Sequence, residues 1–140
     1  MFAKILVGLD GSDGSKRALE QALALARLTG ASVHALSVEE HLPAYAATVG
    51  EMQDEQRYKN QYFHQVQAEA EHAAVAAGVS LTHEVAAGHA AQLLVARARE
   101  LRSDLIVLGH TGHSRLHNLF LGSTADRAVE HAPCAVLIVR

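Results

Sequence analysis

Several residue types are scarce in this sequence, and each scarcity excludes a class of protein. Cys134 is its only cysteine among 140 residues, so no internal disulfide can form, and a reducing compartment such as the cytoplasm is expected. No run of about 18 apolar residues occurs, which excludes an ordinary transmembrane helix. Lysine and arginine total 12 against 15 acidic residues, and a net charge of −3 offers no basic surface to nucleic acid or an anionic membrane. We therefore expect a cytoplasmic protein with no nucleic-acid and no membrane partner.

The apolar content is high although aromatic residues are few. Hydrophobic residues make up 49% of the chain and aromatic residues 4%, with no tryptophan. The core must therefore consist mainly of alanine, valine, leucine and isoleucine. A chain of this length fits one domain over residues 1–140. The first predicted strand begins at Lys4, which leaves little room for a signal peptide, and we expect none.

Two kinds of apolar pattern alternate along the chain. Short continuous runs are typical of strands buried on both faces, and stretches with apolar residues three or four apart are typical of helices. Strands are predicted at 4–10, 31–38, 80–87, 104–109 and 134–140, and helices at 13–29, 51–77, 89–103 and 123–131. This order predicts one doubly wound α/β domain, with a mostly parallel sheet and helices on both faces.

Caps and apolar stripes support the helices. Ser12, Asp13 or Ser15 would cap the first helix, and Gly30 would end it. The long helix 51–77 has an apolar stripe, and so does the last helix. The residues predicted to face inward from these two helices are Tyr62, Val66, Ala70, Ala73 and Ala77, and Ala125, Ala128, Val129 and Ala132.

Two glycine-rich loops follow the first and the fourth predicted strands. They read Gly8-Leu9-Asp10-Gly11-Ser12 and Gly109-His110-Thr111-Gly112. In an open parallel sheet, ligands bind beyond the carboxyl ends of the strands, where the strand order reverses. If these two strands are neighbours, both loops border one crevice.

The second loop leads into a helix that begins at Gly122-Ser123-Thr124. The first amides of a helix have no partner within it, and the positive end of the helix dipole favours an anion. Gly109 and Gly112 would let the backbone approach a ligand, and Asp10 could accept from ribose hydroxyls. The sequence therefore favours a phosphate site. The alternative is that the glycines only form turns and that Ser123 is an ordinary N-cap.

The spacing of these residues carries a resemblance to a known family. The P-loop and dinucleotide-fold glycine motifs are both absent. However, Gly109-x2-Gly112-x9-Gly122-Ser123, together with the opening KILVGLDGSDGS and the ending HAPCAVLIVR, resembles the universal stress proteins of the nucleotide-binding type. The resemblance spans the whole chain. It implies a five-stranded parallel sheet in the order 3-2-1-4-5, bound ATP and a homodimer.

The resemblance also implies which residues would bind ATP. Asp10 would meet the ribose, the backbone of Val38 would read the adenine edge, and the glycines with Ser123 and Thr124 would hold the phosphates. Mg²⁺ or Mn²⁺ would arrive with ATP and be held by the phosphates. The complete implied set is Gly8, Leu9, Asp10, Val38, Gly109, His110, Gly112, His113, Gly122, Ser123 and Thr124. The sequence leaves open whether His110 and His113 contact phosphate.

The histidines do not indicate a structural metal site. His110, His113 and His117 form the densest group of the ten, but Gly112 argues against a helix that would align them. No cysteine or carboxylate nearby in the sequence completes a tetrahedral set of ligands. We therefore expect no protein-bound metal.

No catalytic constellation accompanies the predicted site. Asp10 is the one loop carboxylate expected to lie close, and phosphoryl transfer needs a metal-holding carboxylate and a group that positions the nucleophile. We therefore expect an ATP-dependent sensor or regulator of a stress response. A slow ATP hydrolase or phosphotransferase using the same site, and a nucleotide-free dimeric scaffold, are the alternatives; a flavin-binding redox protein is a weaker one.

The last predicted strand suggests how the chain assembles. Ala135 to Val139 are all aliphatic, and a strand that ends the chain would lie at a sheet edge. An exposed apolar edge favours pairing with another strand. We expect a homodimer formed by antiparallel pairing of this strand with its copy, and regulatory protein partners that the sequence does not identify. The alternative is an edge shielded by a loop.

Overall fold

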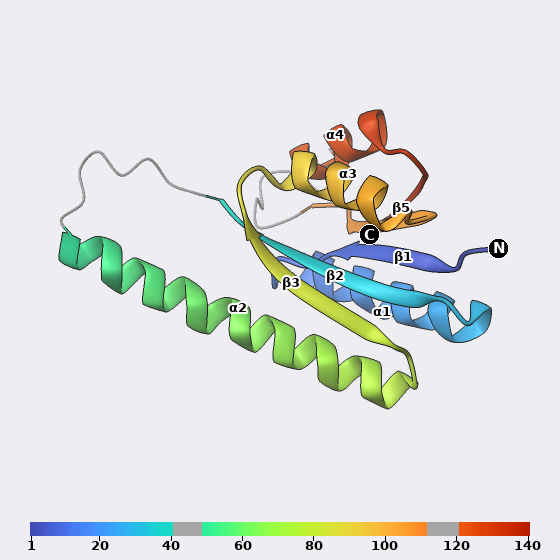
Figure 1. Ribbon diagram of the computed structural model, residues 1–140, viewed down its shortest axis with the longest axis horizontal. Helices are drawn as coiled ribbons and strands as arrows, with labels where there is room; N and C mark the ends of the chain where they lie inside the picture. Colours follow the sequence, from blue (N-terminus) through green and yellow to red (C-terminus); the bar gives the residue numbers. More distant parts are fainter. Residues whose placement is uncertain (41–48, 112–120) are drawn as a thin grey trace.

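The computed structural model describes residues 1–40, 49–111 and 121–140. Strands and helices alternate along these residues (Figure 1). The elements are β1 (Lys4–Gly8), α1 (Asp13–Thr29), β2 (Ser32–Glu39), α2 (Val49–Ala77), β3 (Leu81–Ala87), α3 (Ala90–Leu101), β4 (Leu105–Gly109), α4 (Ser123–His131) and β5 (Ala135–Val139). Within this part of the chain, no helix has the length and apolar character needed to cross a membrane.

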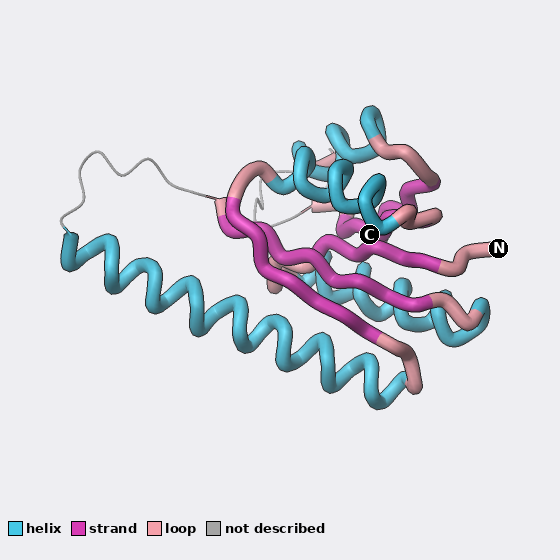
Figure 2. The backbone as a smooth tube through the Cα atoms, in the orientation of Figure 1, coloured by secondary structure: helices cyan, strands magenta, loops and turns pink. Residues whose placement is uncertain are grey.

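The strands form one parallel sheet in the order β3-β2-β1-β4-β5. In the middle of the sheet, Leu6 of β1 lies beside His34 of β2 and Ile106 of β4. The helices α1 and α2 cover one face, and α3 and α4 cover the other (Figure 2). The predicted α/β class, strand order and helices on both faces are confirmed.

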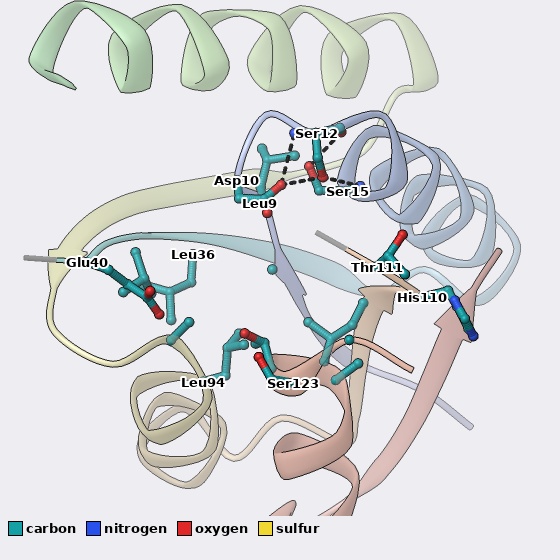
Figure 3. A pocket seen from close by; sticks show the side chains of 18 of the residues that line it. Leu9, Asp10, Ser12, Ser15, Leu36, Glu40, Leu94, His110, Thr111 and Ser123 are labelled. Carbon is teal, nitrogen blue, oxygen red and sulfur yellow. Dashed lines mark hydrogen bonds between the residues drawn. The ribbon is translucent and has the colours of Figure 1, made fainter. Parts of the chain in front are cut away.

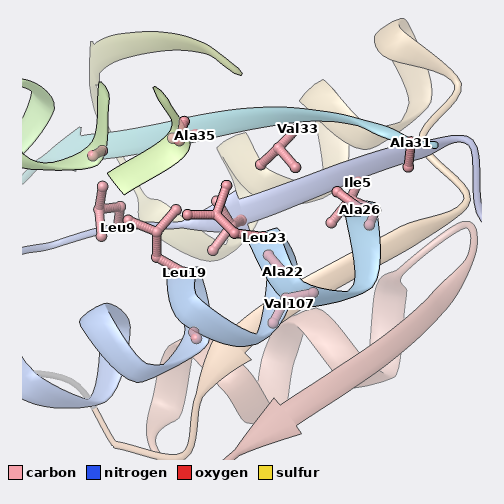
Figure 4. Close-up of a cluster of buried hydrophobic side chains, with 14 of the residues drawn as sticks. Ile5, Leu9, Leu19, Ala22, Leu23, Ala26, Ala31, Val33, Ala35 and Val107 are labelled. Atoms are coloured by element: carbon pink, nitrogen blue, oxygen red, sulfur yellow. The ribbon is translucent and has the colours of Figure 1, made fainter. Parts of the chain in front are cut away.

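Each face of the sheet has its own aliphatic core. Ile5 and Val7 point toward α1 and α2, and the intervening Leu6 points toward α3 and α4, because successive side chains of a strand face opposite ways. Figure 4 shows the first cluster, in which α1 packs Leu19 and Leu23 against the sheet. The strands β1 and β4 are buried on both faces, as their continuous apolar sequences predicted.

Most element ends agree with the sequence, and the differences have local causes. The third helix was predicted to run to residue 103, but α3 ends at Leu101 because Arg102 takes a left-handed conformation with φ of 53°. The first strand ends at Gly8, two residues earlier than predicted, because Asp10 and Gly11 already belong to the turn into α1. Val129 was predicted to face inward but is 50% exposed.

Candidate functional site

A cleft of about 590 Å³ opens at the carboxyl ends of the strands. It lies between the loops that follow β1 and β4, which are adjacent in the sheet although they are far apart in the sequence. The side chains that line it come from both sides of the sheet (Figure 3). The predicted site residues that line it are Gly8, Leu9, Asp10, Val38, Gly109, His110, Gly122, Ser123 and Thr124. Gly112 and His113 lie outside the described residues.

The β1–α1 loop is held in shape by its own polar groups. One carboxylate oxygen of Asp10 accepts hydrogen bonds from the Ser12 amide at 2.9 Å and from the Ser12 hydroxyl at 2.5 Å. The Ser12 hydroxyl oxygen in turn accepts from the amide of Ser15 at 3.2 Å, which caps α1. The Ser37 hydroxyl donates to the Leu9 carbonyl at 2.5 Å and links the loop to β2. Asp10 therefore stands at the cleft in a fixed loop.

Gly109, the first glycine of the motif, has a packing role that the sequence reasoning did not anticipate. A Cβ at residue 109 would lie 2.8 Å from the carbonyl carbon of Gly14, and a Cβ at Gly14 would lie 2.6 Å from the Thr111 carbonyl oxygen. Both obstacles are backbone atoms, which cannot move aside as a side chain can. These two glycines therefore let the first turn of α1 pack directly on the end of β4.

The N-terminus of α4 forms the opposite wall of the cleft from the Asp10–Ser12 loop (Figure 3). Its N-cap is Gly122, which has no side chain to occupy the first amides, so the cap residue itself makes no side-chain hydrogen bond to the helix. The Gly122 amide donates to the His110 carbonyl at 2.8 Å, and the His110 amide donates to the Val139 carbonyl at 2.7 Å. These backbone bonds fix the start of α4 relative to β4 and β5.

His110 lines the cleft, but its ring does not point into the middle of it. Figure 3 shows the imidazole directed away from Ser123 and toward β5. The backbone of His110 is held on both sides by the two bonds described above. The contribution of this residue to the cleft is therefore mainly that of its backbone.

Part of the cleft wall is apolar, and α2 adds two aromatic residues to the lining. The apolar part consists of Leu36, Val38 and Leu94. Tyr62 and Phe63 come from α2, and their rings meet edge to face at 5.3 Å between centroids. Sequence reasoning treated Tyr62 only as part of a helical stripe and did not single out Phe63. The available signal was that two of very few aromatic residues are adjacent in the chain.

Tyr62 also makes a polar contact with the loop that carries Asp10. Its hydroxyl donates to the Asp10 carbonyl oxygen at 2.5 Å. Burial, and next the nearby carboxylate of Asp10, raise the pKa of Tyr62 above its ordinary value of 10. The hydroxyl therefore remains a proton donor over the physiological pH range.

The charges around the cleft are acidic in the part of the chain that the structure describes. Asp10 and Glu40 line it, whereas none of its described lining residues is a lysine or arginine. Glu40 lies near Leu36 at the end away from His110 (Figure 3). Anions are therefore disfavoured at the Glu40 end, and the start of α4 is the part of the wall suited to a negative group.

Comparison with protein families places this chain in one of them. The model of the universal stress protein family matches residues 1–140. The chain belongs to the universal stress protein family. The predicted resemblance to that family over the whole chain is thereby confirmed, whereas a nucleotide-binding role for the glycine motif stays a prediction.

Individual universal stress proteins are similar over the full length. A curated one from Thermus aquaticus is 34% identical over 140 residues, which cover 100% of both chains. The solved structure of UspA from Lactobacillus plantarum is 30% identical with a TM-score of 0.78, covering 99% of this chain and 98% of that one. Another solved universal stress protein, in complex with cAMP, is 29% identical with a TM-score of 0.77, covering 99% of this chain and 97% of that one.

The described part of this universal stress protein offers no metal centre. No group of three or more histidine, cysteine or acidic side chains is arranged to hold an ion within residues 1–40, 49–111 and 121–140. His113 and His117 lie outside these ranges, so the predicted histidine cluster is described only at His110. Cys134 is partly buried, and burial followed by the charge of Asp104 raises the pKa of its thiol, which favours the unreactive protonated form.

Proposed function

We propose that this universal stress protein binds an adenine nucleotide, with ATP as the main ligand, and acts as a nucleotide-dependent sensor or regulator in a stress response. The observation that supports this most is that one cleft holds both an apolar slot and the N-terminus of α4, whose N-cap is a glycine without a side chain. A phosphate suits the first and a base suits the second. The similar universal stress protein solved with cAMP adds support, because cAMP also joins an adenine to a phosphate.

In the proposed pose the phosphates lie at Gly122, Ser123 and Thr124, and the base lies among Leu36, Val38 and Leu94. The backbone of Val38 reads the adenine edge. The Asp10 carboxylate accepts from the ribose hydroxyls between these two ends. Gly112 and His113 are assigned to the phosphates by the family resemblance alone.

The energies of these contacts are sufficient for micromolar binding. The positive end of α4 contributes about 0.3–1 kcal/mol for an exposed anion. Charge-assisted hydrogen bonds from amides and hydroxyls contribute about 1.5–3 kcal/mol each. Together with burial of the base, two or three such bonds reach the roughly −8 kcal/mol that corresponds to micromolar affinity.

A divalent cation in this proposal comes with the nucleotide. The Asp10 carboxylate is already engaged by Ser12, and the described residues form no cluster of ligands for an ion. Mg²⁺ or Mn²⁺ would therefore be held by phosphate oxygens and water, and it would screen the phosphates from Asp10 and Glu40. We expect ATP to bind more tightly with magnesium than without it.

The test is to identify and then titrate the ligand. Freshly purified protein is denatured, and any released nucleotide is identified by chromatography and mass. Stripped protein is then titrated with ATP, AMP and cAMP, with and without magnesium, beside a Gly122→Val variant as control. We expect micromolar binding that the variant loses. An empty protein that binds none of the three nucleotides would favour the nucleotide-free scaffold instead.

A slow hydrolase or phosphotransferase remains the alternative function of the same cleft. The lining carboxylates are Asp10 and Glu40, and the Asp10 carboxylate accepts hydrogen bonds from Ser12 of its own loop. Steady phosphate release by the wild type, above that of Gly122→Val and Ser123→Ala, would favour turnover. We expect no such difference.

We further propose a cytoplasmic homodimer that pairs through β5. This strand is at one edge of the sheet, and Leu137 on it is 36% exposed. The polar edge strand β3 contrasts with it, because β3 carries Thr82, His83 and Glu84. Sedimentation should give a dimer for the wild type and a monomer for Leu137→Glu. A monomeric wild type would contradict the proposal.

A further inference from the structure

The N-terminal part of α2 is exposed, and the helix meets the cleft only further along its length. It has 29 residues, and at 1.5 Å per residue it is about 43 Å long, longer than any strand of the sheet beneath it. The side chains of residues 51–58 are all exposed, and Figure 1 shows this end of α2 extending past the sheet. Tyr62 and Phe63 are the first residues of α2 to meet the cleft.

Tyr62 and Gly11 fit each other closely. Gly11 has a φ of +82°, a left-handed conformation that favours glycine. A Cβ at this position would lie 2.1 Å from the Tyr62 hydroxyl oxygen and 2.9 Å from Cγ2 of Val66. The phenol therefore occupies the space that the glycine leaves, and it lies directly over the turn between Asp10 and Ser12.

Asp10 is held at two of its groups as a result. Its carbonyl accepts from Tyr62, and its carboxylate accepts from the amide and the hydroxyl of Ser12. The carbonyl of Asp10 belongs to the peptide plane that joins it to Gly11, so the Tyr62 bond fixes the rotation of that plane. This plane leads through Gly11 to Ser12, whose amide and hydroxyl hold the Asp10 carboxylate, so its rotation affects where that carboxylate is held.

We propose that Tyr62 is a positioning residue for the nucleotide site: its hydroxyl, through the Asp10 carbonyl, sets the β1–α1 loop so that the Asp10 carboxylate meets the ligand ribose. This inference rests on the proposed function and adds a residue of α2 to it. A tyrosine that served only to fill space would not need its hydroxyl, and phenylalanine would replace it without effect on the ligand.

The experiment distinguishes a positioning role of Tyr62 from a packing role by removing hydroxyl groups from the protein in one arm and from the ligand in the other. Tyr62→Phe removes the hydroxyl alone, and 2′,3′-dideoxy-AMP lacks the ribose hydroxyls that Asp10 would meet. Wild type and variant are titrated with AMP and with dideoxy-AMP by calorimetry. The matched control is Tyr58→Phe on the same helix, where the tyrosine is 69% exposed.

We expect Tyr62→Phe to weaken AMP binding by about 3- to 10-fold, the range of one neutral hydrogen bond, and to leave dideoxy-AMP binding unchanged. Tyr58→Phe should bind both ligands as the wild type does. An equal loss for both ligands, or no loss for either, would overturn the proposal.

A measurement without ligand keeps this proposal distinct from the proposed function. In NMR spectra of the unliganded protein, the Gly11 and Ser12 amide signals should shift in Tyr62→Phe and stay in place in Tyr58→Phe. If wild type binds neither nucleotide, the proposed function fails and the ribose part of this inference fails with it. Shifted amides would then still support the hold of Tyr62 on the loop, and unshifted amides would overturn that as well.

Discussion

The helices α1 and α4 both begin at the walls of the cleft, and their N-termini are capped differently. At α1 the Ser12 hydroxyl accepts from the Ser15 amide, Asp10 accepts from Ser12, and Gly14 packs against the Thr111 carbonyl. At α4 the N-cap is Gly122, which has no side chain with which to cap the helix.

The difference shows that the start of α1, with Ser12 and Ser15, is not equivalent to the Gly-Ser-Thr start of α4. The polar groups of the first loop are largely used within the loop, whereas the N-cap residue of α4 offers no side chain to the first amides of that helix. An anion should therefore prefer α4, and changes at the two helix starts should have different consequences. Variants at α4 should affect ligand binding, and variants at α1 should affect stability.

The largest expected effect is that of Gly122→Val. Gly122 has a φ of −60° and a ψ of 153°, which valine can adopt, so the fold should survive. A branched side chain at the N-cap would crowd the first amides and displace the phosphate. Losing two charge-assisted hydrogen bonds predicts an affinity loss of about 100-fold or more, measured by calorimetry with AMP. Binding within about threefold of wild type would contradict an α4 phosphate site.

Gly14→Ala should be the most destabilising of the changes at α1. The new Cβ would lie 2.6 Å from the Thr111 carbonyl oxygen, so the end of β4 or the first turn of α1 must shift. Such overpacking costs about 1–3 kcal/mol in the free energy of unfolding. Urea denaturation should show this loss, and Glu20→Ala, at an exposed position of α1, should stay close to wild type. A Gly14→Ala variant as stable as Glu20→Ala would mean that the backbone contact is not tight.

A crossed pair of serine variants gives the sharpest test of the comparison. Ser12→Ala removes the cap of α1 and should lower the free energy of unfolding by about 1 kcal/mol. Ser123→Ala removes one hydroxyl from the proposed phosphate site and should weaken AMP binding by about 10-fold. Ser123→Ala should leave the free energy of unfolding nearly unchanged. Ser12→Ala should leave binding of 2′,3′-dideoxy-AMP nearly unchanged, because this ligand lacks the ribose hydroxyls that the Ser12-held Asp10 carboxylate would meet; denaturation and calorimetry measure the two properties. The opposite assignment of the two effects would place the anion at α1.

The smallest effect is expected from inorganic phosphate alone. Without a base in the apolar slot, binding should be weak, in the millimolar range that corresponds to about −4 kcal/mol. In an NMR titration the Thr124 and Ala125 amides should move more than those of Ser15 and Lys16. A chloride titration at equal ionic strength is the control, and equal shifts at both helices would remove the distinction between them.

The sequence was a good guide to elements that are determined locally. The continuous run at 104–109 predicted a strand buried on both faces, and Gly30, with a φ of +75°, ends α1 as its place in the pattern indicated. The end of α3 was harder, because nothing in the residue type of Arg102 announces a left-handed conformation. For the candidate cleft, glycines and helix signals predicted lining residues after β1 and β4 and at the start of α4, and their role in binding stays a prediction.

What the sequence missed depends on contacts between distant residues. Gly109 was interpreted as making room for a ligand, but its Cβ position is taken by the backbone of Gly14. Tyr62 is 52 residues away from Asp10 in the chain, and its hydroxyl bond could not be seen in a helical stripe. Glu40 followed a strand without any motif, yet it lines the cleft.

The sequence by itself determined the order of strands and helices, the parallel α/β class and the family, because hydrophobic period, caps and glycine spacing are properties of neighbouring residues. Only the tertiary structure decided which residues share the cleft and what each glycine makes room for. Those features depend on β1 and β4 lying side by side and on α2 reaching back over the first loop. Distances across the fold, rather than spacing along the chain, set them.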